Sequence, residues 1–289
     1  METSVEMLSS NLSHRQGTNL MQTPIFHFHD LAGRTVALTG AANGIGRAIA
    51  PGLAAQGINL VLIDRDRERL ATVLTELRAG GARAEGVIGD LSAPGERARI
   101  AREIAELSPR IDGIIHNAAI DPRQPLETTS IDFFRHVMAT NVEPAVELTR
   151  DLLPALHRSD AGRIILVGSL TFEVGTALMS AYVAAKGAIV GLTRSLANEL
   201  GPSGITVNCI APGAVVVEKE GERNTEETED AILTWQAVKR RIQPGDLLGI
   251  MCLLLSEAGS CISGQVISVN GGLLHPIADP ELQRPWIGE

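Results

Sequence analysis

From residue 34 onward, the sequence alternates short apolar runs rich in Val, Ile and Leu with longer segments that have helical periodicity. The runs at 59–63 and 163–167 are apolar at nearly every position, which is typical of strands buried on both faces of a parallel sheet. This alternation predicts repeated strand–helix units in which helices cover both faces of one sheet. The expected strands are 34–39, 58–64, 82–89, 111–117, 162–169, 205–210 and 265–269.

Repeated units of this kind predict a Rossmann-type, doubly wound α/β fold with about seven parallel strands. The chain has 289 residues, 44% of them hydrophobic, which is enough for one large core, so a single domain is expected over 31–289. Residues 1–30 are rich in Ser, Asn, Gln and Thr and lack a helical or strand period, so a flexible arm is expected there. Ligands of such sheets bind beyond the carboxyl ends of the strands, which makes the residues after each strand the first candidates for a site.

The charge balance and the cysteines argue against several classes of partner. With 34 acidic and 25 basic residues, the formal net charge of −9 offers no basic surface for nucleic acid or an anionic membrane. No apolar run reaches the roughly 18 residues of a membrane helix, and the N-terminus lacks the pattern of a secretory signal. The three cysteines form no Cys-x-x-Cys pair and no zinc spacing with histidines. We therefore expect a cytoplasmic protein without a metal; for His27 and His29, an arm clipped onto a subunit surface is favoured over a metal pair.

A glycine-rich turn at residues 39–46 follows the first predicted strand and opens the first predicted helix. Glycines let the backbone approach a pyrophosphate closely, and the start of the helix offers unpaired N–H groups to the phosphates. A tight strand-to-helix turn without a ligand would also explain the glycines, so the turn alone is weak support for a dinucleotide site. Its expected cofactor-binding residues are Gly40, Asn43, Gly44, Ile45 and Gly46.

Further candidates for the dinucleotide follow the next three strands. Asp64 ends the second strand, 18 residues after Gly46, where a carboxylate would bind ribose hydroxyls and repel a 2′-phosphate. This favours NAD over NADP, although a guanidinium at Arg65 could pair with a phosphate. The other expected contacts are Asp90 and Leu91 to the adenine and Asn117, Ala118 and Ala119 in close backbone approach.

Tyr182 and Lys186 are four residues apart in a helical stretch, which places both side chains on one face. Such pairs occur by chance, but Tyr182 is the only tyrosine of the chain, and Ser169 ends a predicted strand 13 residues before it. A phenol has a reference pKa of about 10, and a nearby ammonium lowers the pKa by favouring phenolate. The pair therefore indicates an acid/base group for alcohol and carbonyl chemistry.

Residues 34–273 resemble the short-chain dehydrogenase/reductase family in motif order and spacing. The matching pieces are Thr39-Gly-x-x-x-Gly-x-Gly46, Asp90-Leu91, Asn117-Ala118, Asn141-Val142, Ser169, Tyr182-x-x-x-Lys186 and Asn208-x-x-x-Pro212-Gly213. The resemblance implies that Ser169 orients the substrate oxygen, that Tyr182 exchanges its proton, and that Lys186 binds the nicotinamide ribose. It also implies that Asn141 bends its helix and holds a water that links Lys186 to solvent. The resemblance further implies a homotetramer built from helix faces and the C-terminal segment, with a dimer as the alternative. Further implied nicotinamide contacts come from Pro212, Gly213 and Val215.

Two positions depart from the family's pattern. Val217 stands where a Thr or Ser hydroxyl often meets the carboxamide, and Ala119 replaces a usual glycine. Neither change removes a proton-transfer group, but both affect how the cofactor fits.

An insertion at 218–241 is expected to form a mobile lid over the substrate. Its residues 218–230 contain seven acids and two bases, which also suits a solvated loop, and 231–241 have a helical pattern. Trp235 and Val238 would share a face of that helix and close an apolar wall with Leu170, Phe172 and Val215, although ordinary packing explains them equally well. The residues at this mouth, which include Val174, favour a mainly apolar substrate.

The function expected from these residues is NAD-dependent interconversion of an alcohol and a ketone or aldehyde. The alternative is a catalytically silent dinucleotide-binding sensor or scaffold, because fold alone does not decide function. A sugar-nucleotide epimerase fits less well, since the glycine spacing differs and no substrate domain follows.

Overall fold

The computed structural model describes residues 26–217 and 232–273. Within them a parallel sheet has the strand order β3-β2-β1-β4-β5-β6-β7, so the predicted fold is confirmed. All seven predicted strands are present, most of them shorter by one or two residues at their ends. The strands are β1 (Thr35–Thr39), β2 (Asn59–Asp64), β3 (Ala84–Ile88), β4 (Gly113–His116), β5 (Arg163–Val167), β6 (Thr206–Pro212) and β7 (Val266–Val269).

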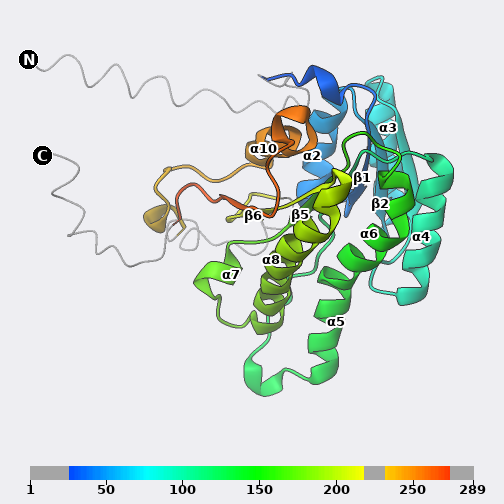
Figure 1. The fold of residues 1–289 in the computed structure, drawn as a ribbon. Helices are drawn as coiled ribbons and strands as arrows, with labels where there is room; N and C mark the ends of the chain where they lie inside the picture. The colour runs from blue at the N-terminus through cyan, green and yellow to red at the C-terminus, as the bar shows by residue number, and fades with distance from the viewer. Residues whose placement is uncertain (1–25, 218–231, 274–289) are drawn as a thin grey trace, which may run out of the picture.

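Helices cover both faces of the sheet (Figure 1). One layer contains α2 (Gly44–Ala55), α3 (Arg67–Ala79) and α10 (Gly245–Leu255), and the other contains α4 (Pro94–Leu107), α6 (Glu143–Leu156) and α8 (Ser180–Leu200). Two further α-helices, α5 (Ile131–Asn141) and α7 (Thr171–Val174), extend beyond the sheet near the start of α8. Short 3₁₀ turns are η1 (His29–Leu31), η2 (Leu126–Thr128), η3 (Gly201–Ser203) and η5 (Glu257–Gly259).

The apolar runs of the strands are continuous because neighbouring residues face opposite helix layers. In β5, Ile165 and Val167 belong to the core beneath α2, α3 and α10, whereas Ile164 and Leu166 belong to the core beneath α4, α6 and α8. All four side chains are at least nine-tenths buried. A strand with two buried faces has no solvent-facing position that would favour a polar residue.

The strand order reverses between β1 and β4. The chain leaves β1 toward β2 and β3, then returns to pair β4 with the other side of β1. Such a reversal opens a crevice at the carboxyl ends of the two central strands. The glycine-rich turn follows β1 and Asn117 follows β4, so the fold brings these two sequence motifs to one edge.

The described part of the expected N-terminal arm, residues 26–30, is docked on the domain. The buried amide of Gln56 accepts from the Phe28 N–H at 2.9 Å and donates to the Phe26 carbonyl at 3.2 Å. Phe26 and Phe28 also pack against the core. The packed chain therefore extends to Phe26, ahead of the expected boundary at residue 31; residues 1–25 lie outside the described part.

Arg97 is a fully buried guanidinium that ties α4 to its neighbours. It donates to the carbonyl oxygens of Leu91 at 2.7 Å and Ala139 at 2.9 Å, and it pairs with Glu143 and Glu147 at 2.8 and 2.9 Å. A buried charge of this kind is tolerated only when its donors are satisfied. Arg97 thus joins the loop after β3 to the end of α5, which carries Asn141.

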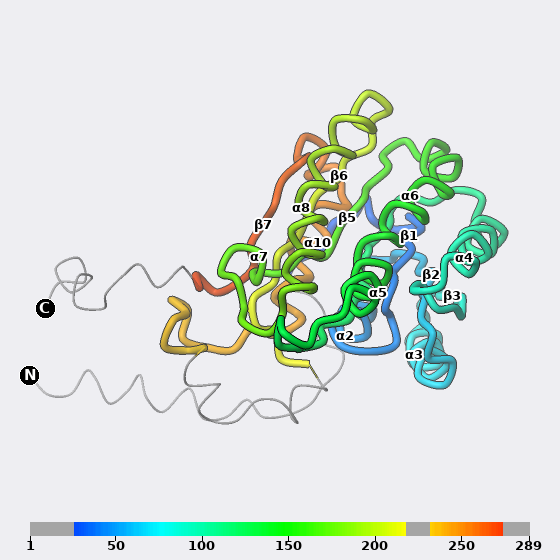
Figure 2. The backbone as a smooth tube through the Cα atoms, turned by 90° about the horizontal axis from the view of Figure 1, so that it is seen from below, coloured from blue at the N-terminus to red at the C-terminus, as the bar shows by residue number. Residues whose placement is uncertain are grey.

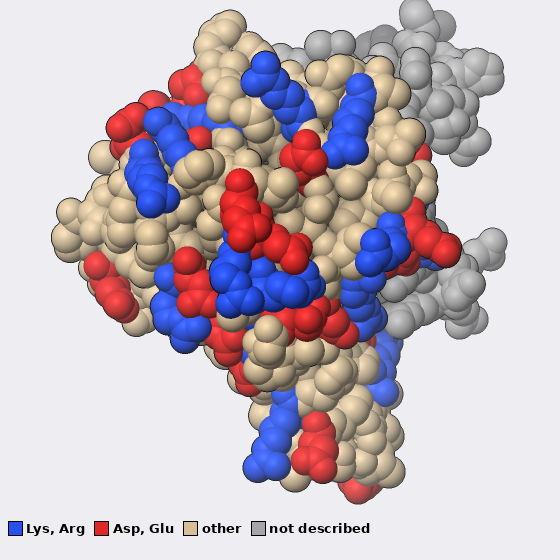
Figure 3. Space-filling view, turned by 90° about the vertical axis from the view of Figure 1, so that its right-hand side faces the viewer, with Lys and Arg blue, Asp and Glu red and all other residues tan. Residues whose placement is uncertain are grey.

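Acidic and basic side chains are interleaved on the face shown in Figure 3. On α4, for example, Arg99 pairs with both Glu96 and Glu103. This face accordingly presents no broad positive surface of the kind that binds polyanions. Among the described helices, none combines the length and the apolar composition required to span a bilayer.

Candidate active site

The glycine-rich turn packs directly against the residue that follows β4. Gly40 and Gly44 have positive φ values of 67° and 55°, which L side chains rarely adopt. A Cβ on Gly46 would collide with the Gly40 carbonyl oxygen, and one on Gly40 would lie 2.8 Å from the Ala118 Cα. Asn117 Nδ2 donates to the carbonyl of Gly40 at 3.1 Å. The turn therefore requires glycine for its own packing as well as for any phosphate that it binds.

Thr39, the first residue of the glycine-rich motif, forms a second clamp at this edge, a role that was not expected from the sequence. Its hydroxyl oxygen accepts the backbone N–H groups of Asn117 at 2.9 Å and Ala118 at 3.0 Å. The side chain of Thr39 is buried, and these bonds span 78 and 79 residues of sequence. The sequence could have indicated this role only through the position of Thr39 at the end of β1. The contact itself becomes visible once β1 is paired with β4.

Asp64 lies beside the glycine-rich turn, as the dinucleotide prediction requires. Its carboxylate accepts the backbone N–H of Ala42 at 2.9 Å through one oxygen and that of Asp66 at 3.0 Å through the other. A carboxylate has about four lone-pair sites, so acceptor capacity remains for ribose hydroxyls. Arg65 is exposed, with its guanidinium 3.9 Å from the Asp90 carboxylate. Asn43 accepts a hydrogen bond from Arg69 of α3.

Ser169, Tyr182 and Lys186 come together where β5 ends beside α8. The Lys186 Nζ is buried, donates to the Val167 carbonyl at 2.7 Å, and lies 5.5 Å from the centroid of the Tyr182 ring. Ser169 follows Val167 by two residues. A hydrogen bond between the side chains of Ser169 and Tyr182 lowers the pKa of the phenol. The expected one-turn spacing on α8 thus aligns the phenol and the ammonium beside the end of a central strand.

Burial controls the protonation of this pair. Tyr182 keeps part of its surface exposed, but burial of its hydroxyl end raises its pKa to about 12, against a lowering by the hydrogen bond with Ser169. Burial has the opposite effect on Lys186, because its charged form is the protonated one, and lowers the pKa of Lys186 to about 8. The charge of Asp121 raises the pKa of both groups, and Cys209 also raises that of Lys186. Lys186 was expected to lower the phenol pKa; in this structure the largest influence on that pKa is burial of the phenol, which raises it.

Asn141 ends α5 and is separated from the start of α6 by Val142 alone, and its side chain binds the segment that follows β4. Its Oδ1 accepts the Ile120 N–H at 2.8 Å, and its Nδ2 donates to the Ile120 carbonyl at 2.9 Å. This paired contact fixes the segment after Asn117, which carries Asp121 toward the phenol. The helix interruption implied by the family resemblance is present, with Val142 at φ −119° and ψ −51° between the two helices.

The turn after β6 lies next to the end of β5. The Leu170 N–H donates to the Pro212 carbonyl at 2.9 Å, and the Gly213 N–H donates to the Val269 carbonyl at 3.0 Å. Val215 is buried and pairs with Ile242. Val217 faces the glycine-rich turn, since its Cγ1 lies 4.0 Å from the position that a Cβ on Gly44 would occupy. The turn expected to seat a nicotinamide is thus beside both the glycines and Ser169.

The predicted helix at 231–241 is wrong, because only 232–235 are helical among its described residues. The buried Gln236 amide donates to the carbonyls of Val238 at 2.5 Å and Arg240 at 2.6 Å, which draws the chain into a loop. This loop runs beside the residues after β7, where the Val238 N–H donates to the Gly271 carbonyl at 2.8 Å (Figure 2). The acidic part of the expected lid, 218–231, lies outside the described residues.

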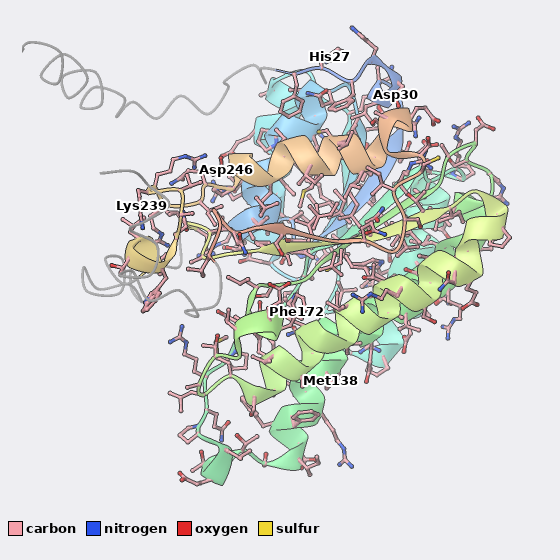
Figure 4. All side chains as sticks on the ribbon, turned by 60° about the vertical axis from the view of Figure 1, so that its left-hand side comes forward. His27, Asp30, Met138, Phe172, Lys239 and Asp246 are labelled. Atoms are coloured by element: carbon pink, nitrogen blue, oxygen red, sulfur yellow. The ribbon has the colours of Figure 1, made fainter. Side chains whose placement is uncertain are left out.

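The expected apolar wall is not assembled in this structure. Trp235 and Val238 share no helix face, and their side chains are 48% and 51% exposed. Leu170 and Val215 are buried, while Phe172 lies on α7 and is half-buried (Figure 4). Of the set, Phe172 is the half-buried member, and it follows Ser169 by three residues.

His27 and His29 lie far from this edge. In Figure 4, His27 and Asp30 are beside α10, at the end of the molecule away from Phe172. The two imidazole rings meet edge to face at 4.7 Å. Across residues 26–217 and 232–273, no three His, Cys, Asp or Glu side chains gather in a way that could hold a metal ion.

Comparison with known proteins independently supports the family resemblance of the sequence. Residues 40–274 match the family model described as enoyl-(acyl carrier protein) reductase. A tropinone reductase homolog of Arabidopsis thaliana is 32% identical over 84% of this chain and 92% of its own length. A candidate NAD(P)-dependent gluconate 5-dehydrogenase of Beutenbergia cavernae, solved with bound NADP, superposes with a TM-score of 0.80 at 37% identity, covering 85% of this chain and 98% of that one. A 3-oxoacyl (acyl-carrier-protein) reductase of Agrobacterium tumefaciens, also with NADP, gives 0.80 at 28% identity, covering 85% and 96%.

The single tyrosine allows its pKa to be measured directly. Tyrosinate absorbance should titrate with a midpoint near 12 in the folded protein and near the ordinary 10.0 in denaturant, because burial disfavours the phenolate. With the folded pKa above the unfolded one, Tyr182 stabilises the fold fully below pH 10.0, and this contribution is lost as the pH rises toward 12. Equal midpoints in folded and denatured protein would contradict the buried environment of the hydroxyl.

Proposed function

This chain belongs to the short-chain dehydrogenase/reductase family, and from that premise we propose that it is an NAD-dependent oxidoreductase that interconverts an alcohol and a ketone or aldehyde. The observation that carries the proposal is the meeting of Ser169, Tyr182 and Lys186 at the end of β5, beside the turn after β6. A silent dinucleotide sensor would have no use for a phenol, a serine and a buried amine at this place. The enzyme is therefore favoured over the sensor.

The residues present fit a nicotinamide dinucleotide. The glycine-rich turn leaves no room for side chains at Gly40 and Gly46, and the α2 N-terminus directs N–H groups toward a phosphate beside it. Asp64 would hold the adenosine ribose, while Lys186 and the turn at Pro212–Gly213 would hold the nicotinamide half. When bound, the nicotinamide ring supplies the carbon that takes or gives a hydride.

The protein's own part in the reaction is to hold the substrate oxygen and move a proton. Ser169 would donate to that oxygen, and the Tyr182 hydroxyl would give its proton to it in reduction, while the deprotonated phenolate oxygen of Tyr182 would accept the proton in oxidation. The raised pKa of Tyr182 keeps the phenol protonated at neutral pH, which is the form that donates. Lys186, with its pKa lowered to about 8, can take up and release a proton near neutral pH. Asn141 would support a water between Lys186 and solvent.

We also propose a cytoplasmic homotetramer that associates through helix faces and the C-terminal segment. Ile131 at the start of α5 and Val146 on α6 are 60% and 43% exposed, so each helix has an apolar side chain available for a contact between subunits. Sedimentation of the purified chain would give the oligomeric state.

Asp64 should set the preference for NAD, although the two solved relatives named above contain NADP. Asp64→Asn keeps an oxygen for the Ala42 N–H but removes the charge, so binding of NADP relative to NAD should improve by about 10-fold. Asp64→Ala should in addition weaken NAD, because both ribose contacts are lost. Titration of nucleotide binding by calorimetry gives both affinities, and tighter binding of NADP than NAD by the unchanged protein would contradict the assignment.

The substrate is expected to be small to medium-sized and mainly apolar, because the half-buried Phe172 near Ser169 offers no hydrogen-bonding group for sugar hydroxyls. The test measures the formation or loss of NADH by its absorbance for each compound of a panel. The panel contains apolar secondary alcohols and ketones together with galactose, gluconate and a 3-oxoacyl thioester. We expect the highest kcat/KM among the apolar compounds. A sugar or sugar acid that is turned over much faster would contradict the substrate class, and binding of NADH without turnover of any compound would favour the sensor.

A further inference from the structure

We propose that Thr171 is a positioning residue that fixes the hydroxyl of Ser169 as a hydrogen-bond donor toward the reacting oxygen. The proposal rests on the proposed function, because it assigns a task to Ser169 in that reaction. It concerns a residue that neither the sequence motifs nor the family resemblance singled out.

The geometry around the Ser169 Oγ carries the inference. The Thr171 hydroxyl lies 2.9 Å from the Ser169 Oγ, and the Thr171 backbone N–H lies 3.2 Å from the same atom. A serine hydroxyl has one hydrogen to donate and two lone pairs that accept. When both groups of Thr171 donate, both lone pairs are filled. The hydrogen of Ser169 must then point to a third atom, on the side away from Thr171.

Thr171 is held rigidly enough to impose this arrangement. It is the first residue of α7, and the preceding Leu170 is buried with its N–H bonded to the Pro212 carbonyl at 2.9 Å. The Gly168 N–H donates to the Ile210 carbonyl at 2.7 Å on the other side of Ser169. These backbone bonds hold Thr171 on one side of Ser169, so its N–H and its hydroxyl both approach the Ser169 Oγ from that side.

The direction of the Ser169 hydroxyl matters for Tyr182. As a donor, Ser169 can stabilise a substrate carbonyl oxygen or the phenolate oxygen of Tyr182, both of which are acceptors. With one lone pair open, Ser169 could instead accept the phenol hydrogen and stabilise the neutral tyrosine. The other groups that act on the phenol are Lys186 on α8 and Asp121 after β4, and neither changes when Thr171 is replaced.

The test compares Thr171→Val, which removes only the hydroxyl from the same shape, with Thr171→Ser, which retains it. We expect kcat/KM of Thr171→Val to fall by about 5-fold to 10-fold, the size of one neutral hydrogen bond, with the loss in kcat and similar for every substrate. The alkaline midpoint of the pH profile for alcohol oxidation should rise. Thr171→Ser should restore both, and Thr75→Val, which removes an exposed hydroxyl on α3, should match the unchanged protein.

A second readout needs neither substrate nor cofactor. At the highest pH at which circular dichroism shows an intact fold, Thr171→Val should have less tyrosinate absorbance at its single tyrosine than the unchanged protein and Thr171→Ser. An unaltered tyrosinate signal together with an unaltered pH profile would overturn the proposal, as would a Thr171→Ser variant as impaired as Thr171→Val. A loss confined to some substrates would instead show direct substrate contact. If the unchanged protein turns over nothing, the proposed function fails, while the tyrosinate comparison still decides the role of Thr171.

Discussion

The contact between the glycine-rich turn and the end of β4 is so close that one added Cβ at Gly46 would collide with the Gly40 carbonyl. Asn117 and Thr39 hold this contact by hydrogen bonds from side chains to backbone. The rest of the site depends on it, because the central strands β1 and β4 bring the dinucleotide turn within reach of β5. A change that separated these two strands would disconnect the expected cofactor site from Tyr182.

The same kind of clamp recurs across the edge of the sheet. Asn141 fixes the segment after β4 through both backbone groups of Ile120, and Leu170 bonds to Pro212 between β5 and β6. Buried hydrogen bonds of this type add rigidity because breaking one would leave a polar group without a partner. They hold the phenol, the serine and the buried amine in one place, which is the arrangement that positioned acid/base catalysis requires.

Much of this architecture could be predicted from the sequence, because it depends on local periodicity. The apolar runs located the strands, and the four-residue spacing aligned Tyr182 with Lys186. Properties that depend on distant packing could not be obtained in this way. The pKa of Tyr182 depends on burial, the loop after Trp235 depends on the amide of Gln236, and the Thr39 clamp links residues 78 positions apart. The short contact from Thr171 to Ser169 was equally invisible, since residues two apart meet in this way only in particular turns.

The most direct test of the account is to replace Tyr182 by Phe and to measure turnover and NADH binding on the same preparation. The substitution deletes one oxygen, keeps the ring, and leaves no other tyrosine that could take over. We predict a loss of kcat of about 100-fold to 10,000-fold with NADH affinity near that of the unchanged protein, because the dinucleotide contacts lie mainly on other strands. Near-full kcat on a confirmed substrate would contradict the assignment of Tyr182 as the acid/base.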